Sequence, residues 1–432
     1  MDCCRDACLR QDRWSLPPST GQLLVEKMQK RPLLGGEGAQ IAIHHVVFLG
    51  EVAHRTIGFK RRYQKRRMSG EIMAGRERKY TPRARTSRPI GEPRTSNAPP
   101  GQPLEPPIPK DGLWFIAEPL AHRLHEKSAL GKRVKGGILL TPEEVMFCHW
   151  YRHVPLPEGP VWFENQLTEN ENVAKRIIAL DVLRNGGERV VPVVHLQERF
   201  PSLPERTWAI RWERHEAWSS HGGFSQVRLQ RTHDHLDWHE LDQWVEDVLT
   251  CGHVAELCVI DEEFDTTIYH LSKTKPHGSH DLKENLSLEL HDALMASCLH
   301  ATPVEGGYFV AHDGAWPLPA LGLPHFSGRY LRGEEFRALT GDVQPEDALY
   351  AELLSAGLLL RPGFKYGCRW RAYEEGIEVA HAPWLVQPQQ DAPENWEEVC
   401  LAVRLAEGVN KRWICALHHA DTHTFLNIQR SG

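Results

Sequence analysis

Three short patterns occur twice in this chain and in the same order, and this internal repeat constrains the fold more than any other feature of the sequence. The pairs are residues 137–144 (GILLTPEE) with 328–335 (GRYLRGEE), 179–186 (ALDVLRNG) with 351–357 (AELLSAG), and 249–252 (LTCG) with 405–408 (LAEG). The spacing between partners shrinks steadily along the chain, which indicates longer surface loops in the first copy. The sequence therefore predicts a tandem duplication.

The amino-terminal 110 residues differ in charge from the rest of the chain. They hold 21 Lys and Arg against 10 Asp and Glu, a net charge of +11, whereas the whole 432-residue chain carries −6 and the remainder therefore −17. Most of this positive charge lies in residues 55–94, which run into a proline-rich stretch. Such a segment buries little apolar surface, so residues 1–110 are predicted to be a disordered extension. It would be an arm that holds nucleic-acid phosphates, or an extension without a function.

The last seventy residues alternate between strand and helix patterns. Residues 364–373 are rich in aromatic side chains and follow a Pro-Gly turn, which predicts a strand, and residues 381–386 predict the next one. Residues 394–407 carry apolar side chains at helical spacing, with Gly408 placed as the C′ residue that ends the helix. A further strand is predicted at residues 412–417.

Tyr373, His381 and Lys411 fall at the borders of these elements, where the pattern predicts a shared sheet edge. A phenol, an imidazole and an ammonium together suit attack by an RNA 2′-hydroxyl on the neighbouring phosphate, which needs a proton acceptor, a proton donor and a fixed positive charge. Histidine donates a proton near neutral pH because its ordinary pKa is about 6.5, whereas tyrosine, near 10, is a poor base unless a cation lies beside it. Lys411 is the candidate for that cation. This chemistry requires neither a metal nor a cofactor.

Three segments, GFKYGCRWRAYEEG, VAHAPWLV and VRLAEGVNKRWICA, closely resemble the catalytic domain of the archaeal tRNA-splicing endonuclease in order and approximate spacing. The resemblance implies a metal-independent cut at the bulges of a bulge-helix-bulge precursor tRNA, which leaves a 2′,3′-cyclic phosphate and a 5′-hydroxyl. It also implies Tyr373 as the general base, His381 as the general acid and Lys411 as the stabiliser of the transition state.

The resemblance also points to residues that bind RNA. Arg404 matches the arginine that sandwiches a flipped bulge base by cation–π stacking. Lys365 and Arg412 are further candidates for contact with RNA, although a solvated turn explains Lys365 equally well.

The first copy differs from the second where the chemistry would take place. When residues 249–252 are aligned with 405–408, Lys411 corresponds to Ala255, and the first copy contains no GFKYG run. Its strands persist at residues 207–212 and 256–260, so it is predicted to be a folded, non-catalytic unit.

An acidic turn closes the first copy. In the family that the chain resembles, an acidic loop of the non-catalytic unit inserts into a basic cleft of the opposite chain. The residues that would do so are Asp261, Glu262, Glu263 and Asp265. Charge complementarity would fix the partner and its register, unless these residues form only a solvated hairpin tip.

The predicted fold is of the mixed α/β class. In each copy a small α/β unit precedes a larger unit with a mixed β-sheet flanked by helices, for which the resemblance implies the restriction-endonuclease-like fold. The predicted units are residues 111–170 and 171–275 in the first copy, and 276–342 and 343–432 in the second. Two chains paired symmetrically would place two active sites at the separation of the two bulges, so the predicted partners are precursor tRNA and a second copy of the chain.

Two other functions stay open at the level of sequence. The chain would be a binding subunit that positions precursor tRNA without cutting it, or a metal-dependent DNA nuclease of the same fold. The second function needs carboxylates around Lys411, and Glu374 and Glu375 are the candidates nearest in sequence.

Histidines and cysteines elsewhere in the chain indicate no metal site. His233, His235 and His239 are of a type that binds zinc, but their spacing is only loosely metal-like. The seven cysteines beyond residue 110 are scattered, most of them in apolar runs. They are predicted to be reduced core residues, and the protein is predicted to be cytoplasmic.

Overall fold

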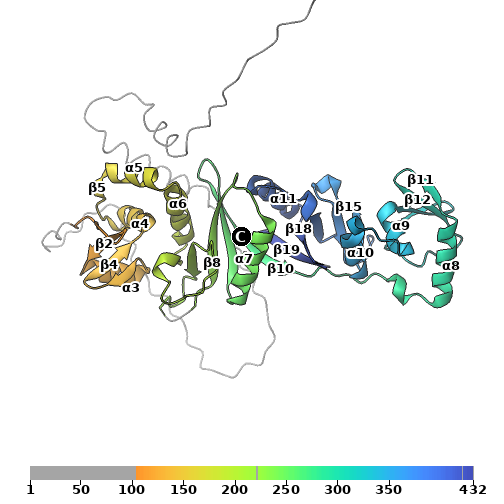
Figure 1. Ribbon diagram of the computed structural model, residues 1–432, viewed down its shortest axis with the longest axis horizontal. Coiled ribbons are helices and arrows are strands. Elements are labelled where there is room, and N and C mark those ends of the chain that lie inside the picture. Colours follow the sequence, from red (N-terminus) through yellow and green to blue (C-terminus); the bar gives the residue numbers. More distant parts are fainter. Residues whose placement is uncertain (1–103, 220–221, 421, 432) are drawn as a thin grey trace, which may run out of the picture.

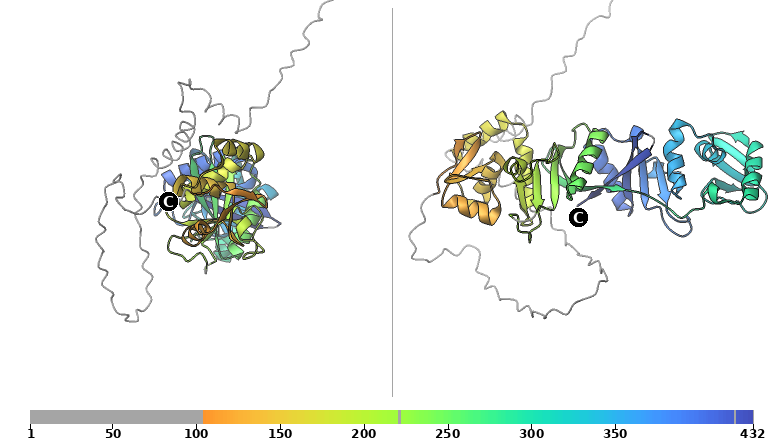
Figure 2. Two further views of the ribbon diagram at one scale, coloured as in Figure 1. Left: turned by 90° about the vertical axis from the view of Figure 1, so that its left-hand side faces the viewer. Right: turned by 60° about the horizontal axis from the view of Figure 1, so that its bottom comes forward.

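The computed structural model describes residues 104–219, 222–420 and 422–431. Most of the predicted basic extension, residues 1–103, lies outside the described residues. Its predicted end at residue 110 is too late, because strand β1 (Ile108–Lys110) already belongs to a sheet. The described part is elongated, with a small unit at each end and one large sheet between them (Figures 1 and 2).

Each end unit contains a four-stranded antiparallel sheet, and the two sheets have the same strand order. The first, in the order β1-β2-β4-β3, consists of β1, β2 (Leu113–Ala117), β3 (Lys132–Val134) and β4 (Gly137–Leu140). The second, in the order β11-β12-β14-β13, consists of β11 (Thr302–Val304), β12 (Gly307–Ala311), β13 (Leu323–His325) and β14 (Gly328–Arg332). The first unit also holds α3 (Leu120–Ser128), α4 (Pro142–Arg152), the short strand β5 (Pro157–Gly159) and α5 (Pro160–Glu169), and the second holds α8 (Leu288–Leu299) and α9 (Gly333–Thr340).

The central sheet has ten strands in the order β15-β16-β17-β18-β19-β10-β9-β8-β7-β6. The first half supplies β6 (Arg189–Pro192), β7 (Ala209–Trp212), β8 (Ser225–Arg231), β9 (Val254–Ile260) and β10 (Thr266–Thr274). The second half supplies β15 (Leu359–Pro362), β16 (Trp370–Tyr373), β17 (Trp384–Pro388), β18 (Arg412–His419) and β19 (Thr422–Arg430). Within each half the successive pairings are antiparallel, antiparallel, parallel and antiparallel, and β10 pairs with β19 antiparallel to join the halves.

Helices cover both faces of this sheet. α7 (Trp238–Thr250) and α11 (Trp396–Gly408) share one buried apolar cluster on one face. α6 (Val173–Arg184) and α10 (Ala348–Ser355) cover the opposite face, each over its own half. Successive side chains of strand β18 point to opposite faces of the sheet: Trp413 and Cys415 face α11, whereas Ile414 packs in the α10 cluster. Short 3-10 helices connect these elements: η1 (Val193–His195), η2 (Lys283–Asn285), η3 (Pro345–Asp347), η4 (Phe364–Tyr366) and η5 (Gln389–Asp391).

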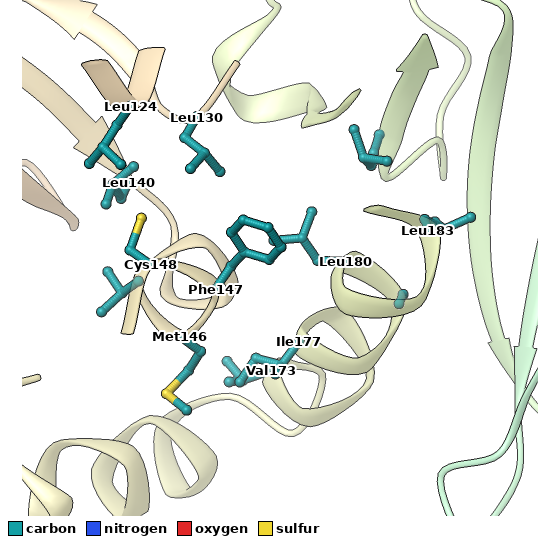
Figure 3. Packing of buried hydrophobic residues seen from close by; sticks show 14 of the residues in the cluster. Leu124, Leu130, Leu140, Met146, Phe147, Cys148, Val173, Ile177, Leu180 and Leu183 are labelled. Carbon is teal, nitrogen blue, oxygen red and sulfur yellow. The ribbon is translucent and has the colours of Figure 1, made fainter. Parts of the chain in front are cut away.

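In the first half, α4 and α6 pack together and attach the end unit to the central sheet. Figure 3 shows Phe147 of α4 directed toward Leu180 of α6, with Met146 close to Val173 and Ile177. All these side chains belong to one buried cluster that continues onto β8 and β9. Burial of side chains of this size contributes about 1.5–3 kcal/mol each.

The predicted mixed α/β class is confirmed, and both halves show the same order of sheets and the same strand pairing. The predicted strands at residues 207–212 and 256–260 are present as β7 and as part of β9, although β7 begins only at Ala209. The duplication and the exact limits of the predicted units stay predictions.

Three local predictions around the carboxy-terminal strands were wrong. Residues 364–366 form η4 rather than strand, because Gly367, at φ 65°, turns the chain and β16 begins only at Trp370. His381 precedes β17 instead of starting it, because Pro383 has no N–H to donate to the ladder. Gly408 lies within α11, and the left-handed residue after the helix is Asn410, at φ 54°.

All seven cysteines within the described residues are free. Cys148, Cys258, Cys298, Cys368 and Cys415 are buried as predicted, whereas Cys251 is exposed and Cys400 is half-buried. Across the part of the chain that the structure describes, no helix has both the length and the apolar character needed to cross a membrane.

A buried carboxylate ties four strands of the first half together. Glu256 on β9 is 1% exposed and accepts hydrogen bonds from Arg211 Nε at 2.7 Å, Ser225 Oγ at 2.5 Å and His270 Nε2 at 2.8 Å. Burial by itself would raise the pKa of Glu256, but the hydrogen bonds from His270, Arg211 and Ser225 outweigh it and lower the pKa to about 2.

We predict that Glu256→Gln destabilises the protein in a pH-dependent way. Because folding lowers the pKa from 4.5 to about 2, the native carboxylate contributes about 3 kcal/mol above pH 4.5, and this contribution is lost as the pH falls toward 2. Urea unfolding at pH 7 and pH 3 measures the free energy of unfolding. We expect the difference in this free energy between wild type and variant to be smaller at pH 3. The exposed Glu205→Gln serves as control. An equal difference at both pH values would contradict the assignment.

Candidate active site

Tyr373 is the last residue of β16 and lies opposite Leu359 of β15. Its side chain is buried in a small cluster with Leu359, Ala320 and Ala382. The cluster joins three parts of the second half: the end unit through Ala320, the central sheet, and the loop at residues 374–383 through Ala382. The tyrosine therefore stands where the end unit meets the sheet.

Lys411 lies between α11 and β18, as the sequence predicts. Its amide N–H donates to Ala406 O at 2.9 Å, which closes the end of the helix, and its ammonium Nζ donates to Ala382 O at 2.6 Å. Burial lowers the pKa of the Lys411 ammonium below its ordinary value, and the positive charge of Arg371 lowers it further.

His381 is exposed in the loop at residues 374–383 and directly precedes Ala382. Ala382 thus links the three predicted side chains: the tyrosine ring packs against it, the lysine binds its carbonyl, and the histidine is its neighbour in the chain. No direct hydrogen bond joins Tyr373, His381 and Lys411 to one another within the described residues. Their catalytic roles stay predictions.

The structure adds two residues to which the sequence assigned no catalytic or RNA-binding role. The guanidinium carbon of Arg371 lies 5.8 Å from the ring centroid of Tyr373 and 5.8 Å from that of Tyr366. Lys411 Nζ lies 5.8 Å from the Tyr366 centroid as well. Arg371 precedes Tyr373 by two residues, so period-two alternation places both on one face of β16. That spacing was a signal in the sequence.

The three residues predicted to bind RNA do not all lie on the same face of the sheet as Tyr366. Arg404 is exposed on α11, and Lys365 is exposed in η4, next to Tyr366. Arg412 is exposed, but its guanidinium lies over the ring of Trp384 at 5.1 Å, in the cluster under α10. Arg412 is therefore on the face of the sheet opposite to Tyr366, and a contact with RNA at the same site does not fit this position.

A pocket of about 530 Å³ lies beside the cluster, between Tyr366 and the exposed side of α11. Its walls include Leu401 and Leu405 of the helix and the side chain of Trp413. A second pocket, of about 600 Å³, lies at the other end of the strands beside His423 and Phe425. The smaller pocket is the one that adjoins Tyr366.

The predicted acidic loop is a tight turn between β9 and β10. Asp261 Oδ1 accepts the amides of Glu263 and Asp265, each at 2.8 Å, so its carboxylate holds the turn itself. Glu262 pairs with His233 at 2.8 Å. Glu263 and Asp265 are exposed and form no ion pair with described residues, so they are the two members best placed to meet a partner.

The other carboxylates and histidines singled out in the sequence have contacts of their own. Glu374 accepts the indole N–H of Trp384 at 2.8 Å. His239 contacts Gln389, and His233 also approaches Glu397 at 3.5 Å. Within the described residues, no three or more His, Cys, Asp or Glu side chains are gathered in a way that could hold a metal ion.

The predicted correspondence between Lys411 and Ala255 is wrong, and His253 takes that place. The amide of His253 donates to Val248 O at 3.2 Å, five residues back, as the amide of Lys411 does to Ala406 O. The error arose because Gly252, at φ 75°, corresponds to the left-handed Asn410 rather than to Gly408.

The side chains at the equivalent positions differ in chemistry. His253 Nε2 donates to Gly222 O at 3.1 Å, while Nδ1 accepts from Gln226 Nε2 at 3.0 Å, and burial lowers the pKa of the ring. Strand register places the buried Trp212 where the second half has Tyr373. The first half thus has neither a phenol nor an amine at these two positions.

Comparison with known proteins agrees with this difference between the halves. Residues 347–425 match the family model described as the tRNA intron endonuclease, catalytic C-terminal domain. This match covers α10 and β15 to β18 and reaches into β19, and it includes Tyr373, His381 and Lys411.

Several archaeal proteins described as tRNA-splicing endonucleases are similar to this chain. The chain is 27% identical to a tRNA-splicing endonuclease of Picrophilus torridus over 172 residues, 40% of this chain and 54% of that protein. It is 29% identical to one of Thermoplasma volcanium, over 40% of this chain and 54% of that protein. It is 29% identical to one of Methanococcus vannielii, over 33% of this chain and 79% of that protein.

The chain spans about half the length of the first two relatives that it matches. The match nevertheless includes the segments GFKYGCRWRAYEEG, VAHAPWLV and VRLAEGVNKRWICA, on which the resemblance was based. The resemblance is thereby confirmed: this chain is similar to the archaeal tRNA-splicing endonucleases, and its residues 347–425 match the catalytic C-terminal domain of that family.

Proposed function

We propose that this protein is an endonuclease that removes introns from precursor tRNA by cutting at bulge-helix-bulge sites without a metal ion. The observation that carries the proposal is the arrangement of Tyr373, His381 and Lys411 around Ala382, inside the segment that matches the catalytic domain. The products would be a 2′,3′-cyclic phosphate and a 5′-hydroxyl.

Each of the three side chains supplies one of the functions that the reaction needs. Tyr373 accepts the proton of the 2′-hydroxyl, whose oxygen then bonds to the neighbouring phosphorus. His381 donates a proton to the 5′ oxygen as the bond between phosphorus and that oxygen breaks. Lys411 stabilises the negative charge that builds up on the phosphoryl oxygens. Between turnovers Tyr373 loses to water the proton that it has accepted, and His381 regains one from water, to which its exposed ring has access.

Two features of this geometry support the division of roles. The hydrogen bond from Lys411 to Ala382 O fixes the ammonium next to the loop that carries the histidine. The exposed His381 has direct access to the solvent from which it regains its proton, and packing fixes the position of the Tyr373 ring.

The predicted second function as a DNA nuclease gains no support from the carboxylate positions. Glu374 already accepts a hydrogen bond from Trp384, a residue of the cluster under α10. The cytoplasmic location stays a prediction.

We further propose that the protein acts as a homodimer in which the acidic turn of one copy meets a cationic cleft of the other. The residues proposed to line it are Arg329 on β14 and Arg361 on β15, which lie close enough for their charges to act on each other. Arg361 donates to Glu335 Oε1 and to Gly322 O, each at 3.0 Å, yet its Nε is buried without a partner in the described residues. Arg329 Nε is in the same state. The positive charges of these two guanidinium groups suit a carboxylate such as that of Glu263 or Asp265.

We predict that the wild-type protein cuts a bulge-helix-bulge precursor tRNA in EDTA and that His381→Ala cuts it at least about 10²-fold more slowly, because the leaving oxygen lacks its acid. The variant should fold as wild type does, since the side chain is exposed, and we expect it to bind the RNA about as well. Gel analysis of end-labelled RNA, with phosphatase resistance of the 3′ ends, measures both rate and chemistry.

The exposed His277→Ala in the linker between the halves is the matched control and retains full activity. Binding of the precursor without any cutting by wild type would favour the non-catalytic binding subunit. Cutting that stops in EDTA and leaves 3′-hydroxyl ends would contradict the proposal.

We predict that the double variant Glu263→Lys, Asp265→Lys halves the mass of the protein in solution, because it places like charges opposite the arginines. Light scattering after size exclusion measures the mass, and Glu289→Lys on the exposed start of α8 is the control. A wild type that is already monomeric, or a double variant that stays dimeric, would show that the acidic turn does not hold the dimer together.

A further inference from the structure

Arg371 lies beside the proposed catalytic residues but takes no part in the proton transfers proposed for Tyr373 and His381. The sheet sets its place: Arg371 pairs with Arg361 on β15 and with Leu385 on β17, and it shares the face of Tyr373. Its Nε donates to Pro362 O at 3.1 Å, which anchors the guanidinium. Its two terminal amino groups form no hydrogen bond within the described residues, so the part best suited to bind an oxyanion is unused.

Tyr366 holds this arginine and Lys411 on one ring. Both cationic groups lie 5.8 Å from its centroid, a distance at which the ring quadrupole attracts a positive charge. Tyr366 itself is placed by η4, where its amide donates to Gly363 O at 2.8 Å, and by packing against the apolar cluster under α11. The GFKYG turn therefore brings two positive charges together.

The two charges repel each other, and the described residues provide no counter-charge. Neither Arg371 nor Lys411, both half-buried, forms an ion pair with any described carboxylate, whereas the neighbouring Arg361 pairs with Glu335. The effect of the repulsion is visible in the pKa of Lys411, which Arg371 lowers in addition to the effect of burial. A pair of close, unpaired cations beside a phenol is a site prepared for an anion.

We infer that Arg371 and Lys411 together form a two-cation clamp for the scissile phosphate, in which Tyr366 is the positioning residue. This inference rests on the proposed function and adds a residue to it. The two terminal amino groups of Arg371 donate hydrogen bonds to the non-bridging oxygens, and the ammonium of Lys411 binds the same phosphate. The chemistry of the step is unchanged: the 2′ oxygen bonds to phosphorus, and the 5′ oxygen leaves with the proton of His381.

The clamp explains why the site tolerates a lysine whose pKa is lowered. When a phosphate binds, its negative charge offsets the repulsion between the two cations and raises the pKa of Lys411. Charge develops on the non-bridging oxygens as the reaction proceeds, so both cations bind the transition state more strongly than the bound substrate. Loss of one therefore lowers kcat more than it weakens binding.

The test compares Arg371→Gln with Arg369→Gln in the full-length protein. Both variants remove one positive charge from the same hairpin, but the guanidinium of Arg369 lies 5.5 Å from the ring of Trp370, in the cluster on the other face. We expect Arg371→Gln to lower kcat on the bulged precursor by about 10²–10³-fold. Binding of a precursor with 2′-deoxy nucleotides at both cleavage sites should change by less than about tenfold. Arg371→Lys should be intermediate, because it keeps the charge and loses the planar fork, and Arg369→Gln should remain close to wild type.

A second pair of variants isolates the role of the Tyr366 ring. Tyr366→Phe keeps the aromatic face and retains activity, whereas Tyr366→Leu loses the face and lowers kcat. If Arg371→Gln fails to fold, this pair of variants still tests whether the Tyr366 ring positions the two cations. Equal activity of the Phe and Leu variants would show that the ring does not position the cations.

An NMR titration of Lys411, which does not depend on cleavage, tests whether Arg371 lies close to it. In protein with ¹³C-methylated lysines, the pKa of Lys411 should rise in Arg371→Gln and stay unchanged in Arg369→Gln, because only the first variant removes the repelling charge. Inorganic phosphate should shift the Lys411 signal in wild type and much less in Arg371→Gln.

The outcomes separate the two proposals. A wild type that makes no cyclic phosphate in EDTA refutes the proposed function, and the clamp is then judged by the phosphate titration alone. A wild type that cuts, with Arg371→Gln cutting within about threefold of it, overturns the clamp and leaves the proposed function standing. Equal losses in Arg371→Gln and Arg369→Gln would also overturn it, because general charge would then account for the effect.

Discussion

The pairing of β10 with β19 is the interaction on which the rest of the structure depends. Its register runs from Tyr269 opposite Arg430 to Thr274 opposite Phe425, and it converts two five-stranded sheets into one. Because β10 and β19 direct Leu271 and Leu426 to the same side, α7 and α11 share a single core. The first half thereby supports the second, as its Trp238 donates a hydrogen bond to Pro393 O just before α11.

The sequence predicted the elements of the fold well and their ends less well. The periodic apolar residues of α11 and the aromatic run of β16 report burial, which is a property of each element by itself. The ends depend on single residues that override the pattern, such as Gly367 at the turn before β16 and Pro383 before β17. A left-handed Asn410 in place of the expected glycine caused the misalignment of Lys411 with Ala255.

Tyr373, His381 and Lys411 could be selected in advance because their residue types suit one reaction and their segments resemble one family. The sequence did not predict that Ala382 links these three residues, nor that Arg371 contacts Tyr366. The spacing of Arg371 and Tyr373 indicates only that both lie on one face of β16. The position of the Tyr366 ring depends on how the turn at residues 363–367 folds, which the spacing along the chain does not give. Arg412 shows the converse, since a basic residue next to Lys411 in sequence points to the other face.

The central claim is that the 2′-hydroxyl of the RNA is the nucleophile and that the second half of this chain activates it. The most direct measurement uses a precursor tRNA in which the nucleotide on the 5′ side of one cleavage site carries 2′-hydrogen in place of the hydroxyl. The account predicts that this site is not cut while the unmodified site in the same molecule is cut in EDTA. Cutting at the modified site would contradict the account, because water or another nucleophile would then have attacked the phosphorus.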